Sequence, residues 1–577
     1  MKKKILEFIG VFFAYLVLAT IAYRVILLTP GTIGHNWDWP IGASSLHSRY
    51  MFENALYVWQ TGNLASYPLF QTLTIFNKLF YLPVNFGING EWLGKMILLA
   101  TSTLAGVFSF YLIKNLIGGN LLDKKEKLFS SFFGGVFYAF SPFLFNDLIG
   151  GSITHIITYP FIPLVFLFFE KAIKSNRKNI FIIFSAVGLS IITLAIQYLV
   201  FITVLFFIYI IFHEKRKRAL KVILKIFLVW FFLNFYWLGS LIHTILAGAG
   251  VTAGSFVASD DNLRNGVPSL LTALSGRGYF RDFFTYSIPI FLKPFWYLSV
   301  YGFLGLALWI VLIKKVNKKS IFWVFILLFS LVFATGGKPP FGNFVLWLYH
   351  YLPLMGMFRS VQHFIVMPTL ALSLILGLSI YHIITEEKLP VSQTVRKIII
   401  LGILFIWLIP SFIYGDIGSK LLKSKFYGGN FIDQYQLSPG YKEMFSFLEK
   451  DKSLFRILFL PMAYSPYFLK TEYQDKAQGG DPLFSSPWPI VSSTTNNVLT
   501  QKLESNIYNA KNPQEVKTIM NLFGIKYVVL RGDVVPIFEK ESQNWDYLKT
   551  SKYLENYKFL RLISSLDYVS LYEVTNE

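Results

Sequence analysis

One carboxylate near the N-terminus has neighbours that could make it chemically active. Asp38 lies between Trp37 and Trp39 in the stretch NWDWP, shortly after the first apolar run. At a membrane surface, two indole rings would remove part of the hydration of the carboxylate and raise its basicity toward that of a general base. The same stretch also fits a turn with a solvated acid and two tryptophans of the interfacial aromatic belt. Both interpretations stay open on spacing alone.

A second acid, Asp147, lies in the stretch FNDLIGG at the end of a later apolar run. A carboxylate there could orient substrate hydroxyls or assist Asp38 in taking up a proton. The alternative is that Asp147 only satisfies backbone groups at a helix end. Asp38 and Asp147 are the two candidate catalytic residues.

Three arginines could hold an anionic group. Arg359 lies in MFRSVQHF, four residues before His363, and Arg277 and Arg281 lie four apart in an earlier loop. A guanidinium binds phosphate through two parallel hydrogen bonds, so we predict that Arg277, Arg281, Arg359 and His363 bind a phosphate. Arg359 also fits an anchor for lipid headgroups, and Arg277 and Arg281 fit ion pairs within their own loop.

Histidines and aromatic rings supply further candidates for binding an uncharged substrate. Trp37, Trp39, His35 and His155 are predicted to line the site, although each histidine alone also fits an ordinary polar contact. No HxxxH or HExxH spacing is present and the chain has no cysteine, so the sequence predicts no metal site. A Walker phosphate loop, a dinucleotide-binding GxGxxG motif and a serine nucleophile elbow are also absent from the sequence.

Membrane helices must position these residues. The 577 residues are 54% hydrophobic and 15% charged, with a mean hydropathy of +0.51, which is typical of a multi-pass membrane protein. The first apolar run lacks a small-residue cleavage site, so we expect a retained helix rather than a signal peptide. With about 20 residues per span, the sequence predicts about eleven membrane helices. They lie near 5–29, 92–114, 128–147, 154–171, 179–195, 197–213, 222–246, 296–313, 320–336, 363–385 and 397–414.

The distribution of the net charge of +21 along the chain indicates how the chain is oriented in the membrane. This charge is concentrated in short basic clusters between apolar runs, whereas the segment from Asp416 onward is close to neutral. Such clusters favour the cytoplasmic side, so the sequence predicts a plasma-membrane protein with a cytoplasmic N-terminus and an extracytoplasmic C-terminal part. Residues 179–213 are short for two full spans, although the charges at both ends require an even number of crossings.

The predicted outer side carries structured loops and a separate domain. The first loop, about 30–90, is rich in aromatic residues and predicts helices in the interface. The segment 337–364 predicts a partial helix that is too short to cross twice. After the membrane domain of residues 1–415, residues 416–577 alternate strand-like and helix-like segments, and predict an α+β extracytoplasmic domain.

The order of these features resembles a known superfamily. An acid after the first span, interfacial helices in the first loop, an acid at the end of the third span and a C-terminal extracytoplasmic domain resemble the GT-C membrane glycosyltransferases. Within that superfamily, GHNWDWPIG, FNDLIGG and PLMGMFRSVQHF are similar to the membrane half of the mycobacterial AftD-type arabinofuranosyltransferases and to YfhO-like membrane proteins. The stretch NLFGIKYVVLRGD also resembles a strand of the YfhO-like C-terminal part.

This resemblance implies a reaction and its partners. It implies inverting transfer of a sugar from a polyprenyl-phosphate donor to an envelope glycan, glycolipid or glycoprotein, with Asp38 as general base. The first loop has no Asp-x-Asp pair, so no cofactor is certain and a divalent cation stays open. The partners are the donor, the acceptor and the bilayer, and no nucleic acid is expected.

Two other classes of function remain compatible with the sequence. A transporter or flippase for lipid-linked glycans would share the aromatic residues and the cavity, but usually shows mid-membrane charges or internal repeats. A noncatalytic envelope scaffold would leave every acid in a surface turn. Replacing Asp38 separates these classes from an enzyme, because an enzyme alone would lose turnover.

Overall fold

The protein is described by a computed structural model that divides into two compact units. Residues described are 2–34, 45–54, 78–118, 124–175, 178–246, 260–265, 267–278, 288, 290–312, 318–352, 355, 361–387, 389–413, 433–435, 438–462, 467–471, 474–479, 488–491, 498–536 and 546–575. One unit comprises Met1–Leu27 and Met96–Ile417, and the other comprises Leu28–Lys95 and Gly418–Glu577. The predicted domains 1–415 and 416–577 stay a prediction, and the first predicted loop groups with the C-terminal part.

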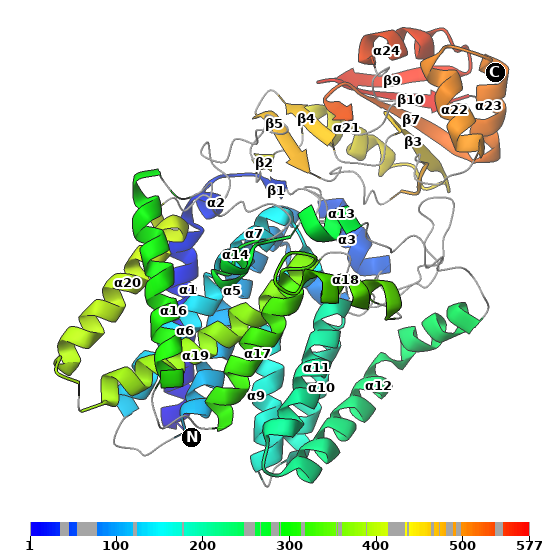
Figure 1. The fold of residues 1–577 in the computed structure, drawn as a ribbon. Helices are drawn as coiled ribbons and strands as arrows, with labels where there is room; N and C mark the ends of the chain where they lie inside the picture. The colour runs from blue at the N-terminus through cyan, green and yellow to red at the C-terminus, as the bar shows by residue number, and fades with distance from the viewer. Residues whose placement is uncertain are drawn as a thin grey trace. The chain divides into compact units, whose positions relative to one another are not determined.

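The first unit is a bundle of helices (Figure 1). Its long helices are α1 (Lys2–Ala22), α5 (Gly90–Ile117), α6 (Lys124–Ala139), α9 (Phe161–Lys174), α10 (Lys178–Ile192), α11 (Ile196–Phe212), α12 (Arg216–Leu246), α16 (Lys293–Leu312), α17 (Lys318–Ala334), α19 (Val366–Thr385) and α20 (Gln393–Ile413). Shorter elements are α7 (Pro142–Gly150), α8 (Ile153–Thr158), α13 (Asp260–Asn265), α14 (Leu270–Leu274), η4 (Ile290–Leu292), α18 (Gly342–Tyr351) and η6 (Val361–Ile365). The short helix α2 (Arg24–Leu28) follows α1.

The count of eleven spans is not supported, although the chain is a multi-pass helical membrane protein. Seven helices in the described residues are long and apolar enough to cross a membrane: Lys3–Ala22, Gly90–Ile117, Lys124–Leu148, Ile153–Lys174, Arg216–Gly239, Ile290–Trp309 and His363–Thr385. A helix is present at each of the other predicted positions, but α10, α11 and α17 have 15, 17 and 17 residues. Fifteen residues of helix reach roughly 22 Å, less than the roughly 30 Å of a hydrocarbon core.

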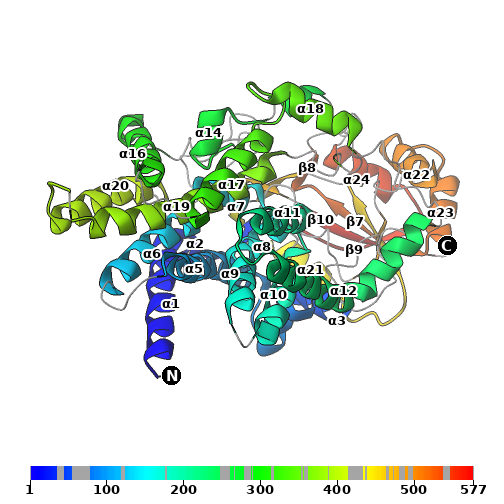
Figure 2. The same ribbon diagram turned by 60° about the horizontal axis from the view of Figure 1, so that its bottom comes forward.

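Helix α19 forms the centre of the first unit. It lies among α6, α16 and α17, as Figure 1 and Figure 2 show from two directions. The span His363–Thr385 is 89% buried, whereas the span Lys3–Ala22 is 17% buried. A helix that is apolar on all sides fits a fully enclosed position, and α6, α16 and α17 pack around α19.

The C-terminal part forms a mixed sheet with helices on both faces. Its strand order is β6 (Ile490–Val491), β3 (Arg456–Leu460), β7 (Ile525–Arg531), β10 (Val569–Val574) and β9 (Leu560–Leu566). Strand β3 runs parallel to β6 and β7, and β10 is antiparallel to β7 and β9. The helices of this part are α21 (Pro439–Leu448), α22 (Val498–Tyr508), α23 (Pro513–Leu522) and α24 (Tyr547–Glu555). The predicted α+β domain is confirmed.

Burial on both faces explains the apolar central strands. In β3, Leu458 and Leu460 belong to one core, whereas Ile457 and Phe459 belong to the other. A strand covered on both sides has no reason to alternate apolar and polar residues. The turn from β9 to β10 has positive φ at both Asp567 (46°) and Tyr568 (64°), as in a two-residue hairpin of type I′.

Part of the predicted first loop is also described. A short strand β1 (Thr32–Gly34) pairs antiparallel with β2 (Asp433–Tyr435), followed by α3 (Ser45–Asn54) and η1 (Leu82–Phe86). A small sheet joins β4 (Tyr467–Thr471), β5 (Gln474–Gly479) and β8 (Val534–Pro536). In the described parts of these segments, α3 and η1 lie in the first loop and α18 and η6 lie in 337–364, and their place in the membrane interface stays a prediction.

Candidate functional site

Three residues selected from the sequence converge in the first unit. Among the described residues, Asp147, His155 and His363 form a group whose potential ligand atoms all lie within 4.8 Å of one another. Asp147 is fully buried, His363 is 7% exposed and His155 is half-buried. We call Asp147, His155 and His363 the polar cluster.

The ends of three spans meet at the polar cluster. Asp147 lies at the end of the span Lys124–Leu148, His155 near the start of Ile153–Lys174, and His363 at the start of His363–Thr385. Helix α7 begins after Ser141, whose Oγ accepts a hydrogen bond from the Leu144 amide at 3.2 Å. It ends at Gly151, where a positive φ of 74° turns the chain toward α8. This turn brings His155 back beside Asp147.

A pair of tyrosines fixes the junction that carries the polar cluster. The rings of Tyr138 and Tyr159 stack with centroids 4.2 Å apart. Each hydroxyl donates to the backbone oxygen of the other residue, at 3.0 Å and 2.9 Å. The Tyr159 hydroxyl also lies 3.1 Å from Ser141 Oγ. These contacts hold the end of α6 and the start of α7 against the loop that follows α8, so they position Asp147 relative to His155.

The two histidines of the cluster lie face to face. Their ring centroids are 4.0 Å apart and their planes differ by 6°. The ring of Tyr198, near the start of α11, meets the ring of His155 edge-on with centroids 5.0 Å apart. Ionisable residues are uncommon in membrane-spanning segments, so three of them gathered at span ends form a candidate functional site.

Arg277 belongs to a turn that touches the same elements. A Cβ atom added at Gly276 would lie 3.5 Å from Thr369 Oγ1 on α19 and 3.6 Å from Pro142 Cδ on α7. Both Gly276 and Gly278 have positive φ, 71° and 105°, so the turn needs glycine there. The turn therefore lies against the helices that bear or adjoin Asp147 and His363.

The guanidinium of Arg277 is held in an aromatic setting. Arg277 Nε donates to Ser275 Oγ at 2.8 Å, and Nη1 donates to the Tyr297 hydroxyl at 3.0 Å. Its Cζ lies 5.3 Å from the ring centroid of Trp296 and 5.0 Å from that of Tyr297. Arg277 is 7% exposed. A pre-oriented guanidinium with low exposure is well suited to an anionic ligand.

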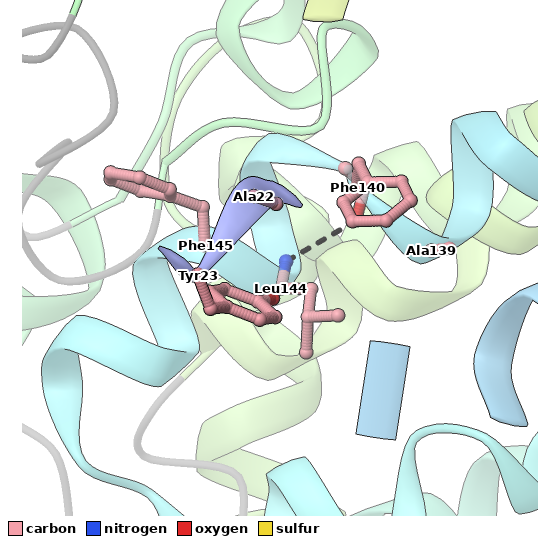
Figure 3. A pocket seen from close by; sticks show the side chains of 7 residues that line it. Ala22, Tyr23, Ala139, Phe140, Leu144 and Phe145 are labelled. Atoms are coloured by element: carbon pink, nitrogen blue, oxygen red, sulfur yellow. Dashed lines mark hydrogen bonds between the residues drawn. The ribbon is translucent and has the colours of Figure 1, made fainter. Parts of the chain in front are cut away.

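A mainly apolar pocket opens beside the start of α7 (Figure 3). It is a small, partly open hollow with a cavity volume of about 10 Å³, and it is lined by Ala22, Tyr23, Ala139, Phe140, Ser141, Leu144 and Phe145. The Tyr23 hydroxyl lies 2.6 Å from Ser102 Oγ, which holds this wall in place. The pocket's lining residues Leu144 and Phe145 lie within one helical turn of Asp147 on α7.

The other predicted site residues lie outside the described residues. These are His35, Trp37, Asp38, Trp39, Arg281 and Arg359. The polar cluster was not predicted as a unit because His363 lies more than 200 residues after Asp147 and His155, which are themselves only eight residues apart. One signal was available, since Asp147, His155 and His363 each lie at the end of a predicted span on the same predicted face.

Known structures share this fold. No protein-family model matches the sequence, and no curated protein matches it. The cryo-EM structure of arabinofuranosyltransferase AftD from Mycobacteria is 15% identical, with a TM-score of 0.62 over 99% of this chain and 40% of that chain. A mutant form of AftD gives 14% identity and the same TM-score over 99% and 42%.

The archaeal oligosaccharyltransferase AglB from Archaeoglobus fulgidus, solved with an inhibitory peptide and a dolichol-phosphate, is 12% identical. It has a TM-score of 0.48 over 90% of this chain and 69% of that chain. This chain spans about two fifths of the length of the AftD chains. The likeness to AftD shows that this chain shares the fold of the matched part of that protein.

Proposed function

We propose that this chain, which has a GT-C-like fold, transfers a sugar from a polyprenyl-phosphate donor to an envelope glycan, glycolipid or glycoprotein. The observation that carries the proposal is the polar cluster at the meeting point of three span ends, within a fold otherwise seen in AftD. The turn that carries Arg277 lies against α7 and α19, and its guanidinium is held by Ser275 and by Tyr297 of α16.

The proposed reaction is an inverting displacement at the anomeric carbon. An acceptor hydroxyl oxygen attacks that carbon, a new C–O bond forms, and the bond to the donor phosphate oxygen breaks. Asp38 takes the hydroxyl proton, and polyprenyl phosphate leaves with the bonding electron pair. A fixed cation stabilises the charge that grows on the phosphate, and we assign this role to Arg359 with His363, Arg277 or Arg281.

The remaining candidates bind the sugars. Asp147 orients sugar hydroxyls or assists Asp38, and Trp37, Trp39, His35 and His155 contact the sugar or the acceptor. The reaction takes place on the outer face of the plasma membrane. We place the C-terminal domain on that side, where it can hold the acceptor.

Turnover of purified protein in lipid nanodiscs tests the proposal. Wild type, Asp38→Asn and Asp147→Asn are incubated with a panel of polyprenyl-phosphate sugars and acceptors, and released polyprenyl phosphate is followed by mass spectrometry. Removing a general base lowers turnover by about 10²–10⁴-fold, so we expect that loss in Asp38→Asn. Asp567→Asn is the matched control, because asparagine tolerates the positive φ of this turn position.

The outcomes separate the classes of function. Release that survives Asp38→Asn would move the base to Asp147 or to another acid. If folded wild type releases polyprenyl phosphate from none of the donors, the enzyme hypothesis is rejected. A lipid-linked glycan transporter or a scaffold would then be the remaining functions. A transporter would then move a fluorescent lipid-linked glycan across a vesicle membrane, whereas a scaffold would not.

A further inference from the structure

The chemistry of the polar cluster goes beyond contacts to a sugar. It offers two imidazole rings and one carboxylate, which is a ligand set used by divalent transition metals in proteins. We propose that Asp147, His155 and His363 bind a divalent transition-metal ion, with Zn²⁺ as the ion that best fits the set. The proposal does not depend on sugar transfer.

The burial of the cluster supports this assignment. Asp147 is fully buried and His363 is 7% exposed, and both lie at the ends of apolar spans. Taking a carboxylate out of water is expensive unless a cation or donors compensate it. A divalent ion at the cluster would place a cation beside the buried carboxylate and would use the two imidazoles as ligands.

The identity of the ligand atoms selects among metals. Mg²⁺ and Ca²⁺ prefer oxygen ligands, mainly carboxylate, carbonyl and water. Two imidazoles instead favour Zn²⁺ and its first-row neighbours. With three protein ligands, such a site keeps a position for water or a substrate, as catalytic zinc sites do.

Binding requires a small rearrangement of the side chains. The ligand atoms lie within 4.8 Å of one another, whereas ligands of a tetrahedral ion at about 2.0–2.1 Å are roughly 3.3 Å apart. The parallel rings of His155 and His363 cannot both direct a lone pair at one ion, so one ring must turn. The Tyr138–Tyr159 pair holds the backbone of the junction, so the change falls on the side chains.

The number of zinc ions bound per chain tests the proposal directly. The full chain is purified in nanodiscs with a histidine-free tag, dialysed against buffered Zn²⁺ and desalted, and bound zinc is counted by mass spectrometry. We expect about one Zn²⁺ per wild-type chain, and an occupancy at least about 10-fold lower at limiting Zn²⁺ in Asp147→Asn, His155→Gln and His363→Gln. His382→Gln is the matched control on the opposite end of α19 and should keep the ion.

A second measurement remains informative where a variant fails to fold. Co²⁺ bound tetrahedrally absorbs strongly in visible light, so wild type loaded with Co²⁺ should show these bands and lose them when Zn²⁺ is added. Absence of zinc and of the Co²⁺ bands in folded wild type would overturn the proposal. Equal zinc in wild type and in folded His363→Gln would overturn it as well, and neither result needs a sugar donor.

Discussion

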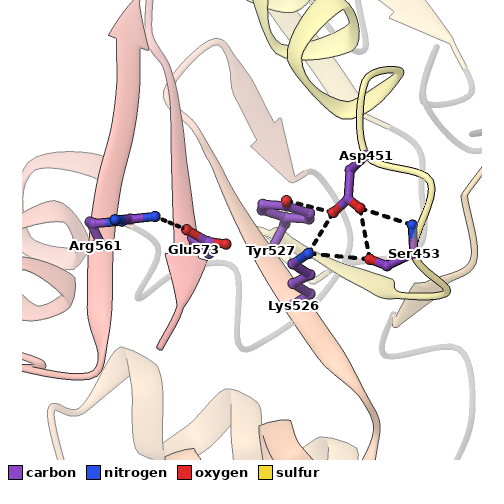
Figure 4. Close-up of polar contacts among 6 residues, drawn as sticks. All are labelled: Asp451, Ser453, Lys526, Tyr527, Arg561 and Glu573. Atoms are coloured by element: carbon purple, nitrogen blue, oxygen red, sulfur yellow. Dashed lines mark hydrogen bonds and ion pairs between the residues drawn. The ribbon is translucent and has the colours of Figure 1, made fainter. Parts of the chain in front are cut away.

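At the scale of single residues, Asp451 joins two elements of the C-terminal sheet (Figure 4). Its carboxylate accepts hydrogen bonds from Lys526 Nζ at 2.6 Å, from the Tyr527 hydroxyl at 2.7 Å and from the Ser453 amide at 2.9 Å. The Lys526 ammonium, with the two Ser453 donors and Tyr527, holds the pKa of Asp451 well below its usual range. The turn before β3 is thus attached to the start of β7.

This shift sets a pH dependence of stability. A depressed carboxyl pKa contributes stability above the unfolded value, near pH 4, and that contribution is lost as the pH falls toward the folded value. We expect Asp451→Asn to destabilise the sheet at pH 7 by about 1 kcal/mol, a modest figure because solvent screens the partly exposed pair. The difference from wild type should shrink below about pH 4.

Hydrogen exchange of β7 in the full chain, corrected for the intrinsic pH effect, measures this difference. The control is Glu573→Gln, because Glu573 pairs with Arg561, which is 66% exposed, and surface pairs contribute little. An Asp451→Asn effect that is equally large at pH 3 and at pH 7 would contradict the assigned cause.

The residues of the site were individually visible in the sequence, but their grouping was not. Asp147, His155 and His363 could each be selected because a polar residue at the end of an apolar run is uncommon. Their approach depends on the Ser141–Pro142 break, the turn at Gly151 and the position of η6 before α19. These are tertiary effects, so a search for closely spaced ligands could not find them.

At the scale of elements, small residues let the membrane helices approach closely. The ring of Tyr15 on α1 is buried against Gly106 on α5 and Gly135 on α6, and its hydroxyl donates to the Phe132 oxygen at 2.8 Å. A Cβ added at Gly135 would lie 2.1 Å from the Tyr15 hydroxyl oxygen and 2.8 Å from the backbone oxygen of Gly106. Close helix contacts at small residues are typical of helix packing in membranes.

We therefore expect Gly135→Ala to destabilise the helical unit. Overpacking against backbone atoms costs about 1–3 kcal/mol, and the two clashes place Gly135 at the upper end of that range. The gain in helix propensity from glycine to alanine offsets about 1 kcal/mol of it. Gly305→Ala in α16 is the control, because an added Cβ there meets no atom within 4 Å. Equal thermal midpoints for both variants in detergent would contradict the close approach.

The elements themselves were largely predictable, and their lengths were not. A helix lies at each predicted span, and β3, β7, α21 and α23 lie where strand and helix patterns indicated. The predicted span at 128–147 corresponds to the span Lys124–Leu148, which consists of α6 and α7 with a break at Ser141–Pro142 that hydropathy does not reveal. Hydropathy also counted α10, α11 and α17 as crossings, although their hydrogen-bonded lengths fall short.

At the scale of the whole membrane unit, cationic residues gather at the ends opposite the polar cluster. The span that ends near Asp147 begins at Lys124, and the span that begins near His155 ends at Lys174. Lysines of different helices lie within electrostatic reach of one another, as Lys171 does of Lys4, and Lys319 of Lys174 and Lys127. One face of the helical unit is therefore basic, which favours the cytoplasmic side.

This asymmetry predicts the orientation on which the proposed reaction depends. The chain has no cysteine, so a single introduced cysteine reports its own location. Lys215 lies in the basic turn between α11 and α12, and Lys511 is exposed in the C-terminal part. In intact cells, a membrane-impermeant maleimide should label Lys511→Cys and should leave Lys215→Cys unlabelled until the cells are permeabilised. Solubilised protein should react at both positions and wild type at neither, which controls for access. The opposite pattern would place the polar cluster on the cytoplasmic side and would rule out sugar transfer on the outer face, whatever the metal content of the cluster.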